Sequence, residues 1–164
     1  MIVLGVDPGL NVTGYAVLES RQQRIMLLEA GVVRSRPIGS ISSRLKEIGD
    51  GMSEVINQFR PGAIAIENLY SHYVHPRTAI IMGHARGVIC LKGAEAGIEV
   101  FEYAATRIKK ALTGNGRATK SQMQTAVMTL MELKTVPEPP DTADAIAIAL
   151  CHARVQSKGE LAQT

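Results

Sequence analysis

The stretch Ile2-Val3-Leu4-Gly5-Val6-Asp7-Pro8-Gly9 opens the chain and decides the fold. Its first part is a short apolar run rich in β-branched residues, which is typical of a buried strand. The turn sequence Asp7-Pro8-Gly9 ends that strand. The chain therefore begins with a core strand whose carboxyl end carries an acidic residue.

Outward from this strand, the hydrophobic pattern alternates between strand and helix periods. Apolar residues recur at helical spacing from Ile41 to Phe59, and Pro61-Gly62 ends that helix. Further strands are predicted at 12–18, 25–33, 63–67 and 98–103, and helices at 40–59, 78–96, 105–112, 119–133 and 141–155. The order βββαβαβααα predicts an α/β fold, a mixed five-stranded sheet flanked by helices.

Length and composition indicate one folded domain. The chain has 164 residues, of which 46% are hydrophobic and 20% charged, enough for a core. We expect a domain over 1–157 and a short tail over 158–164. No apolar run reaches the roughly 18 residues of a membrane span, and no signal-peptide pattern opens the chain. We therefore expect a cytoplasmic protein with no membrane partner.

Four acidic residues are candidates for a metal site. Asp7 and Glu67 each end a predicted strand, and Asp141 and Asp144 share one face at the start of the last helix. Clustered carboxylates need a compensating cation, and oxygen ligands without nearby Cys favour Mg²⁺ or Mn²⁺. Each also has an ordinary alternative: Asp7 could open a turn, Glu67 could be solvated, and Asp141 could cap its helix.

One stretch of the chain is basic throughout. Between Tyr103 and Met131 no acidic residue occurs, and the basic residues are Arg107, Lys109, Lys110, Arg117 and Lys120. A stretch of one sign suggests an anionic partner such as nucleic acid, although an ordinary solvated face is the alternative. Thr119 and Gln122 form a predicted capping box, which places Lys120 at a helix N-terminus suited to a phosphate.

The segment after Glu67 combines aromatic and basic residues. Tyr70 and Tyr73 could stack on unpaired bases, and Arg77 could contact a phosphate. The alternative is that the tyrosine rings pack on the adjacent helix. His72 and His75 could bind a metal, but histidines in loops are more often solvated.

These motifs together resemble a known family. The matching segments are Val6-Asp7-Pro8-Gly9-Leu10-Asn11-Val12-Thr13-Gly14-Tyr15, Ala65-Ile66-Glu67, Ala85-Arg86-Gly87, Phe101-Glu102-Tyr103-Ala104-Ala105, Lys120-Ser121-Gln122 and Asp141-Thr142-Ala143-Asp144-Ala145. In this order and spacing they resemble the RuvC family, the bacterial Holliday junction resolvases, over about residues 1 to 155.

The resemblance implies an RNase H-like fold and a homodimer that nicks two strands of a four-way DNA junction symmetrically, in DNA recombination and repair. It implies two Mg²⁺ ions per site, with Mn²⁺ as a substitute. It places Asp7, Glu67, Asp141 and Asp144 on the metal ligands, with Asp7 best placed to bridge both ions. Lys109 and Lys120 fall on its two functional lysines, and Tyr70 replaces an aromatic residue that is usually Phe.

The resemblance also implies partners. A branch-migration complex of RuvA and RuvB is implied, together with a second copy of the chain. For that dimer the helix at 78–96 is the best candidate, because it is apolar or small over more than one face. Burial of this helix within one chain is the alternative.

Three other classes of protein share some of these features. Asp7-Pro8-Gly9 followed by Thr13-Gly14 resembles the first phosphate motif of actin-like ATPases, but 164 residues supply only one of the two domains they need. A DNA-binding module without catalysis would be marked by the loss of an acid, and none is lost. A nuclease acting on RNA–DNA hybrids would share the acids, but the lysines and the aromatic segment favour junction DNA.

Overall fold

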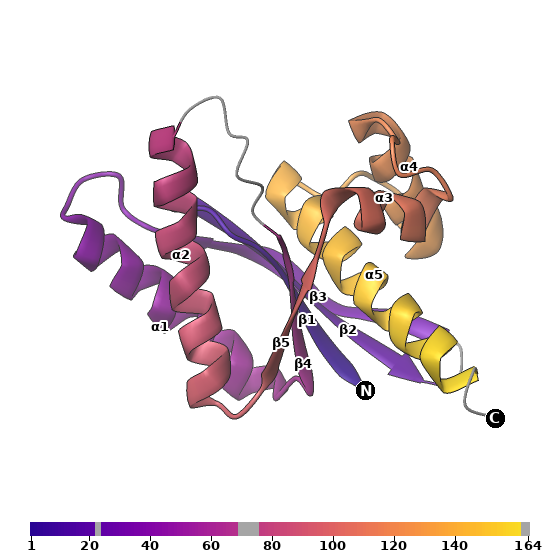
Figure 1. Cartoon of the computed structure of the whole chain (residues 1–164), viewed down its shortest axis with the longest axis horizontal. Helices are drawn as coiled ribbons and strands as arrows, with labels where there is room; N and C mark the ends of the chain where they lie inside the picture. Colours follow the sequence, from indigo (N-terminus) through magenta and orange to yellow (C-terminus); the bar gives the residue numbers. More distant parts are fainter. Residues whose placement is uncertain (22–23, 69–75, 162–164) are drawn as a thin grey trace.

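The computed structural model describes residues 1–21, 24–68 and 76–161 (Figure 1). The elements expected from the sequence occur in the predicted order. They are β1 (Ile2–Asp7), β2 (Val12–Arg21), β3 (Arg24–Arg34), α1 (Ile41–Phe59), β4 (Ala63–Glu67), α2 (Pro76–Glu95), β5 (Glu99–Tyr103), α3 (Ala105–Thr113), α4 (Lys120–Leu130) and α5 (Pro140–Leu161).

The strands form one mixed sheet in the order β3-β2-β1-β4-β5. β1 lies in the middle, antiparallel to β2 and parallel to β4, and β5 continues the parallel part. The side chains of Val3, Leu4 and Val6 are fully buried. The continuous apolar run at the start of the chain thus forms the central strand, as predicted.

Helices cover both faces of this sheet. α1 and α2 lie on one face, and α5 lies on the other with α3 and α4 beside it (Figure 1). Alternate residues of β1 point into different cores: Leu4 packs in the core on the α1 side, whereas Val3 packs in the core that contains α5. The fold is the predicted mixed α/β sheet with flanking helices.

α5 approaches the sheet unusually closely. A Cβ atom on Gly5 of β1 would lie 2.3 Å from the carbonyl oxygen of Ala145, and one on Gly14 of β2 would lie 2.1 Å from that of Asp141. Only glycine leaves room for a helix backbone at these positions. Because Gly14 pairs with Asp7, this packing brings the first turn of α5 to the carboxyl end of β1.

Two predicted helix ends are wrong. α4 was expected to reach Leu133, but it ends at Leu130; Glu132 then adopts a left-handed conformation with φ 53°, which turns the chain. α5 was expected to end at Val155, but it continues to Leu161, into the segment expected to be a tail. Within the described ranges, no helix is long and apolar enough to cross a membrane.

Candidate active site

Two of the predicted acids lie side by side at the edge of the sheet. Val6 pairs with Ile66 in the parallel β1–β4 ladder, so Asp7 and Glu67 follow at neighbouring positions. Side chains alternate along a strand. Since Val3 and Ala65 face the core that contains α5, Asp7 and Glu67 point to the same side of the sheet.

The other two acids come from the first two turns of α5. Asp141 is half-buried and Asp144 is exposed. The helix begins at Pro140, so Asp141 lies inside its first turn and not at the capping position that was considered as an alternative. Within the described residues, none of the four carboxylates accepts a hydrogen bond from a neighbouring group. They are thus available to a ligand.

The charges of these carboxylates act on one another. Burial and, next to it, the negative charges of Asp144, Asp141 and Glu67 together raise the pKa of Asp7 to about 7, while the positive charge of Lys120 opposes them. Loss of hydration also raises the pKa of Glu67, with the charge of Asp144 adding to it. The site therefore holds more negative charge than its surroundings compensate.

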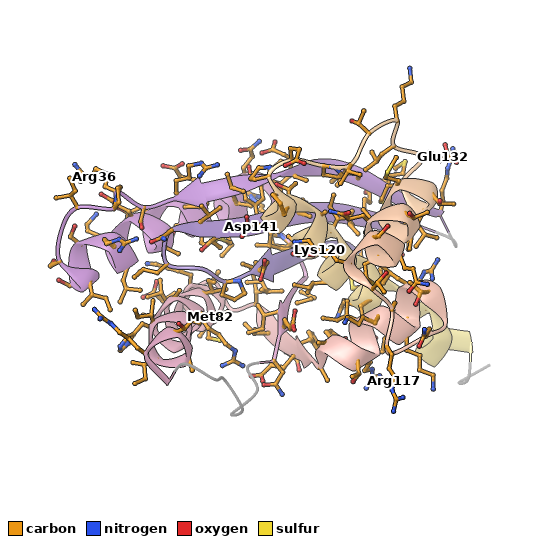
Figure 2. All side chains as sticks on the ribbon, turned by 90° about the horizontal axis from the view of Figure 1, so that it is seen from above. Arg36, Met82, Arg117, Lys120, Glu132 and Asp141 are labelled. Carbon is orange, nitrogen blue, oxygen red and sulfur yellow. The ribbon has the colours of Figure 1, made fainter. Side chains whose placement is uncertain are left out.

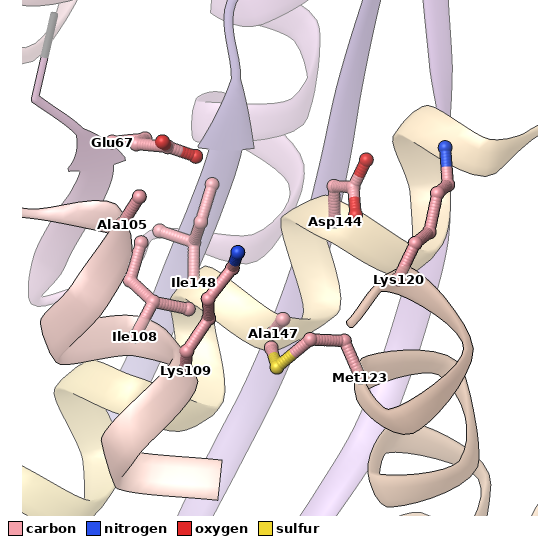
Figure 3. Close-up of a pocket in the computed structure, with 9 residues that line it drawn as sticks. All are labelled: Glu67, Ala105, Ile108, Lys109, Lys120, Met123, Asp144, Ala147 and Ile148. Carbon is pink, nitrogen blue, oxygen red and sulfur yellow. The ribbon is translucent and has the colours of Figure 1, made fainter. Parts of the chain in front are cut away.

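A cavity of about 280 Å³ opens between β4, α3, α4 and α5. Its charged lining residues are Glu67, Asp144, Lys109 and Lys120. Figure 3 shows their charged ends directed to the same side, with Lys120 next to Asp144 and Lys109 between the two acids. Two acids and two lysines thus surround one opening, which suits a phosphate bound through a cation and through lysine.

The N-terminus of α4 holds Lys120 in place. The Thr119 hydroxyl accepts a hydrogen bond from the backbone N–H of Gln122 (3.2 Å), and the Gln122 side chain accepts one from the Thr119 N–H (2.9 Å). The predicted capping box is therefore confirmed. Lys120 is the first residue of the helix, so the positive end of the helix dipole adds to its charge.

The remaining basic candidates lie outside this cavity. The side chains of Arg107, Lys110 and Arg117 are exposed, and Figure 2 shows Arg117 well away from Lys120 and Asp141. Arg77 is exposed in the first turn of α2. Tyr70, Tyr73, His72 and His75 lie outside the described residues.

Sequence analysis missed the apolar floor of the cavity, formed by Ala105, Ile108, Met123, Ala147 and Ile148. These residues look like ordinary core positions in the sequence. Helical spacing could have indicated them, because residues four apart lie on the same face of a helix. Ile148 lies four residues after Asp144, and Ala105 lies four residues before Lys109. A floor of this kind limits water beneath the charged groups and strengthens their interactions.

The donor set suits a hard divalent cation. All four carboxylates offer oxygen, which Mg²⁺ and Mn²⁺ prefer. In the described part of the chain, no three acidic, histidine or cysteine side chains converge closely enough to hold an ion as they stand. Burial, followed by the neighbouring negative charges, raises the pKa of Asp7, and a bound divalent cation would offset both effects.

The chain forms a mixed five-stranded sheet with flanking helices, the RNase H-like fold, with acids at the ends of β1 and β4 and on α5. The sequence matches the family described as "Crossover junction endodeoxyribonuclease RuvC" over residues 3–152. It is 56% identical to the enzyme of that name from Rhodopirellula baltica, over 91% of this chain and 84% of the relative. A second relative, from Desulforamulus reducens, is 41% identical over 96% of both chains.

Solved structures agree with the sequence matches. Thermus thermophilus RuvC in complex with a Holliday junction superposes with a TM-score of 0.91 at 34% identity, covering 97% of this chain and 96% of that one. The yeast mitochondrial Holliday junction resolvase (TM-score 0.66, 15% identity, 95% and 79% covered) shares the fold. The chain belongs to the RuvC family of crossover junction endodeoxyribonucleases.

Proposed function

We propose that this protein cuts four-way DNA junctions by metal-dependent hydrolysis of phosphodiester bonds. The observation that carries the proposal is the set of four carboxylates from β1, β4 and α5 whose charges act on one another at Asp7, next to a cavity lined by Glu67, Asp144 and two lysines. The names of the relatives, together with the junction bound in the similar Thermus structure, supply the substrate.

Asp7, Glu67, Asp141 and Asp144 are the residues that would hold the metal, which we propose to be two Mg²⁺ ions, replaceable by Mn²⁺. When bound, the ions make a water nucleophilic and stabilise charge on the attacked phosphate and on the leaving oxygen. Asp7 lies where the charges of the other three acids meet, so its carboxylate is the one best placed to serve both ions.

The two lysines take different parts. Burial raises the pKa of all three acids; the positive charge of Lys120 opposes this rise at Asp7 and Asp144, whereas that of Lys109 opposes it at Glu67. Lys120 therefore lies closer to the centre of the site and stabilises charge that develops on the phosphate. Lys109 mainly positions the DNA strand. With saturating junction, we expect Lys120→Ala to slow cleavage, while Lys109→Ala weakens binding and leaves the bound rate nearly intact.

Symmetric cutting requires two sites, which a homodimer supplies. α2 offers the surface for it. The side chains of Ile80 and Leu91 are 61% and 54% exposed, and the space above Gly83 and Gly87 is open. Apolar and small residues that no other described residue covers are typical of a contact with a second copy.

The outer basic residues extend the proposed DNA surface. Arg107, Lys110 and Arg117 would neutralise phosphates beyond the cavity, and Arg77 would do so in the first turn of α2. Tyr70 and Tyr73 would stack on bases at the junction centre. We also propose that the chain works with a branch-migration complex of RuvA and RuvB, as the family resemblance implies.

Cleavage assays with Mg²⁺ test this function. A four-way junction, a plain duplex and an RNA–DNA hybrid of matched length are compared, using the wild type and Asp7→Asn. We expect paired nicks in the junction only, and no nicks from Asp7→Asn although it still binds the junction. Equal cleavage of duplex or hybrid would contradict the proposed substrate, and an active Asp7→Asn would contradict the proposed site.

A further inference from the structure

One buried polar contact takes no part in the chemistry above. The phenol oxygen of Tyr103, at the end of β5, and Nδ1 of His152, on α5, lie 2.8 Å apart in a hydrogen bond. The two residues are 5% and 0% exposed. Among the described residues, this is the one hydrogen bond between two side chains that is buried. Such a bond is directional, and breaking it leaves a buried polar group without a partner.

Tyr103 also holds the strand end that carries Glu67. Glu67 and Tyr103 are paired in the β4–β5 ladder. The carbonyl of Tyr103 accepts a hydrogen bond of 2.9 Å from the N–H of Asn68, the next residue after Glu67. The backbone of Tyr103 thus fixes one acid of the site, while its side chain reaches the helix that carries two others.

His152 lies on the same face of α5 as Asp144. Asp144, Ile148 and His152 are spaced four residues apart, which aligns them along the helix. The His152 ring packs 4.6 Å from the ring centre of Phe101 on β5. Its Nε2 has no hydrogen-bond partner among the described residues, so the bond to Tyr103 is the ring's one polar contact there. Burial lowers the pKa of His152, which keeps the ring neutral.

The rest of the contact between α5 and the sheet is close apolar packing, and among the described residues no second side-chain hydrogen bond joins them. The backbone of Ala145 and Ala149 and the methyl group of Ala149 lie directly on Gly5. Ile146 and Ile148 add apolar burial, but apolar attraction is not directional. A hydrogen bond, in contrast, tolerates only a few tenths of an ångström in length.

We propose that Tyr103 and His152 are positioning residues, which fix α5 along its axis and so set the spacing of Asp141 and Asp144 from Glu67. This inference rests on the proposed function, because the spacing matters for the metal ions that those acids would hold. Neither residue lines the cavity. Their hydrogen bond joins α5, which carries Asp141 and Asp144, to β5, which pairs with the strand that ends in Glu67.

The test measures Mn²⁺ binding to the full-length protein without DNA, by electron paramagnetic resonance, in Tyr103→Phe, His152→Leu and the double variant. Tyr103→Phe keeps the ring, and with it the contact of Arg107, whose guanidinium lies 5.6 Å from the ring centre. We expect each single variant to bind Mn²⁺ about 10-fold more weakly. The double variant leaves no polar group unpaired, so its Tm should recover while its Mn²⁺ affinity stays low.

Tyr15→Phe is the matched control. It removes a phenol hydroxyl that donates a 2.7 Å hydrogen bond to Glu29, between β2 and β3. We expect a lower Tm with the Mn²⁺ affinity of the wild type. Wild-type Mn²⁺ affinity in the double variant would overturn the inference, because metal binding would then not depend on this bond.

A crystal structure of metal-free Tyr103→Phe gives a second readout. We expect α5 to be shifted along its axis relative to Glu67, and an unshifted helix would overturn the inference whatever the metal does. Failure of the proposed function looks different: the wild type itself would bind no Mn²⁺, or would bind it equally well after Asp7→Asn.

Discussion

α5 and α2 are both long helices rich in apolar and small residues, yet the molecule uses them in opposite ways. In α5, Ala145 and Ala149 are buried on Gly5, whereas a Cβ atom on Gly83 or Gly87 of α2 would meet no described residue within 4 Å. Figure 1 shows α5 lying along the sheet and α2 on the opposite side, next to α1. Small residues therefore serve close packing within the chain in one helix and leave a free surface in the other.

α5 and α2 also have different roles. α5 brings acids to the sheet, and its place decides the charge at the site. No described residue of α2 lines the cavity, and we assign the open face of this helix to a second copy. Substitutions in α5 or beneath it should therefore affect chemistry and folding, while those on the open face of α2 should affect association.

The largest effect is expected for Asp144→Asn on α5. Removing this charge weakens the metal site, so junction cleavage in Mg²⁺ should fall by about 1000-fold, while binding of the junction survives. Single-turnover cleavage and a binding assay in Ca²⁺ separate the two. Leu91→Asn, on the open face of α2, is the control. At a protein concentration high enough to form the dimer, this variant should cut the junction at the wild-type rate. Near wild-type cleavage by Asp144→Asn would remove this residue from the set of ligands.

A methyl group under α5 should cost much of the stability. The Cβ atom added by Gly5→Ala would lie 2.3 Å from the carbonyl oxygen of Ala145. Because this distance is too short for two unbonded atoms, either α5 or β1 must move. We expect the free energy of unfolding in urea to fall by about 3 kcal/mol. An unchanged midpoint would show that the close approach of α5 is not required.

A charge on the open face of α2 should act on the dimer alone. Ile80→Asp changes a side chain that is 61% exposed within the chain, so the stability of the monomer should hardly change. Burying an unpaired carboxylate between two copies should weaken the dimer about 100-fold. Sedimentation velocity measures this, and dimerisation as tight as in the wild type would place the interface elsewhere.

The smallest effect is expected for Gly83→Ala. An added Cβ meets nothing within 4 Å, and alanine favours a helix over glycine by up to about 1 kcal/mol. Unfolding at a concentration low enough to keep the chain monomeric should show a small gain in stability. A loss would mean that this face of α2 is covered within the chain, which would break the contrast with α5.

Much of this could be predicted from the sequence because the decisive signals are local. The apolar run before Asp7, the helical period from Ile41 to Phe59 and the capping box at Thr119 each depend on neighbouring residues only. The end of α4 could not be predicted, since it depends on the left-handed conformation of Glu132, a residue type that usually continues a helix.

The sequence predicted which acids belong to the candidate site, but it could not predict how burial and neighbouring charges act on Asp7. Strand ends and helical spacing indicated Asp7, Glu67, Asp141 and Asp144. That burial and three like charges all act on Asp7 depends on how closely α5 lies on Gly14, which only the packed structure reveals. The same holds for the bond between Tyr103 and His152, whose partners lie 49 residues apart in the chain.

The central claim is that α5 gathers carboxylates around Asp7, and the pKa of Asp7 tests it most directly. The folded-state pKa of about 7 exceeds the ordinary value of 3.8, so the folded protein binds the proton more tightly than the unfolded chain. Without metal, stability should fall as the pH rises from about 4 to 7 and stay low above that range. Asp7→Asn should remove this fall.

Carbon-13 NMR of the aspartate carboxyl groups in the metal-free protein, assigned with Asp7→Asn, gives the pKa itself. A value of about 7 is predicted for Asp7, with a lower value in Asp144→Asn, because one of the neighbouring charges is gone. An Asp7 that titrates near 3.8 and does not respond to Asp144→Asn would contradict the gathering of carboxylates by α5.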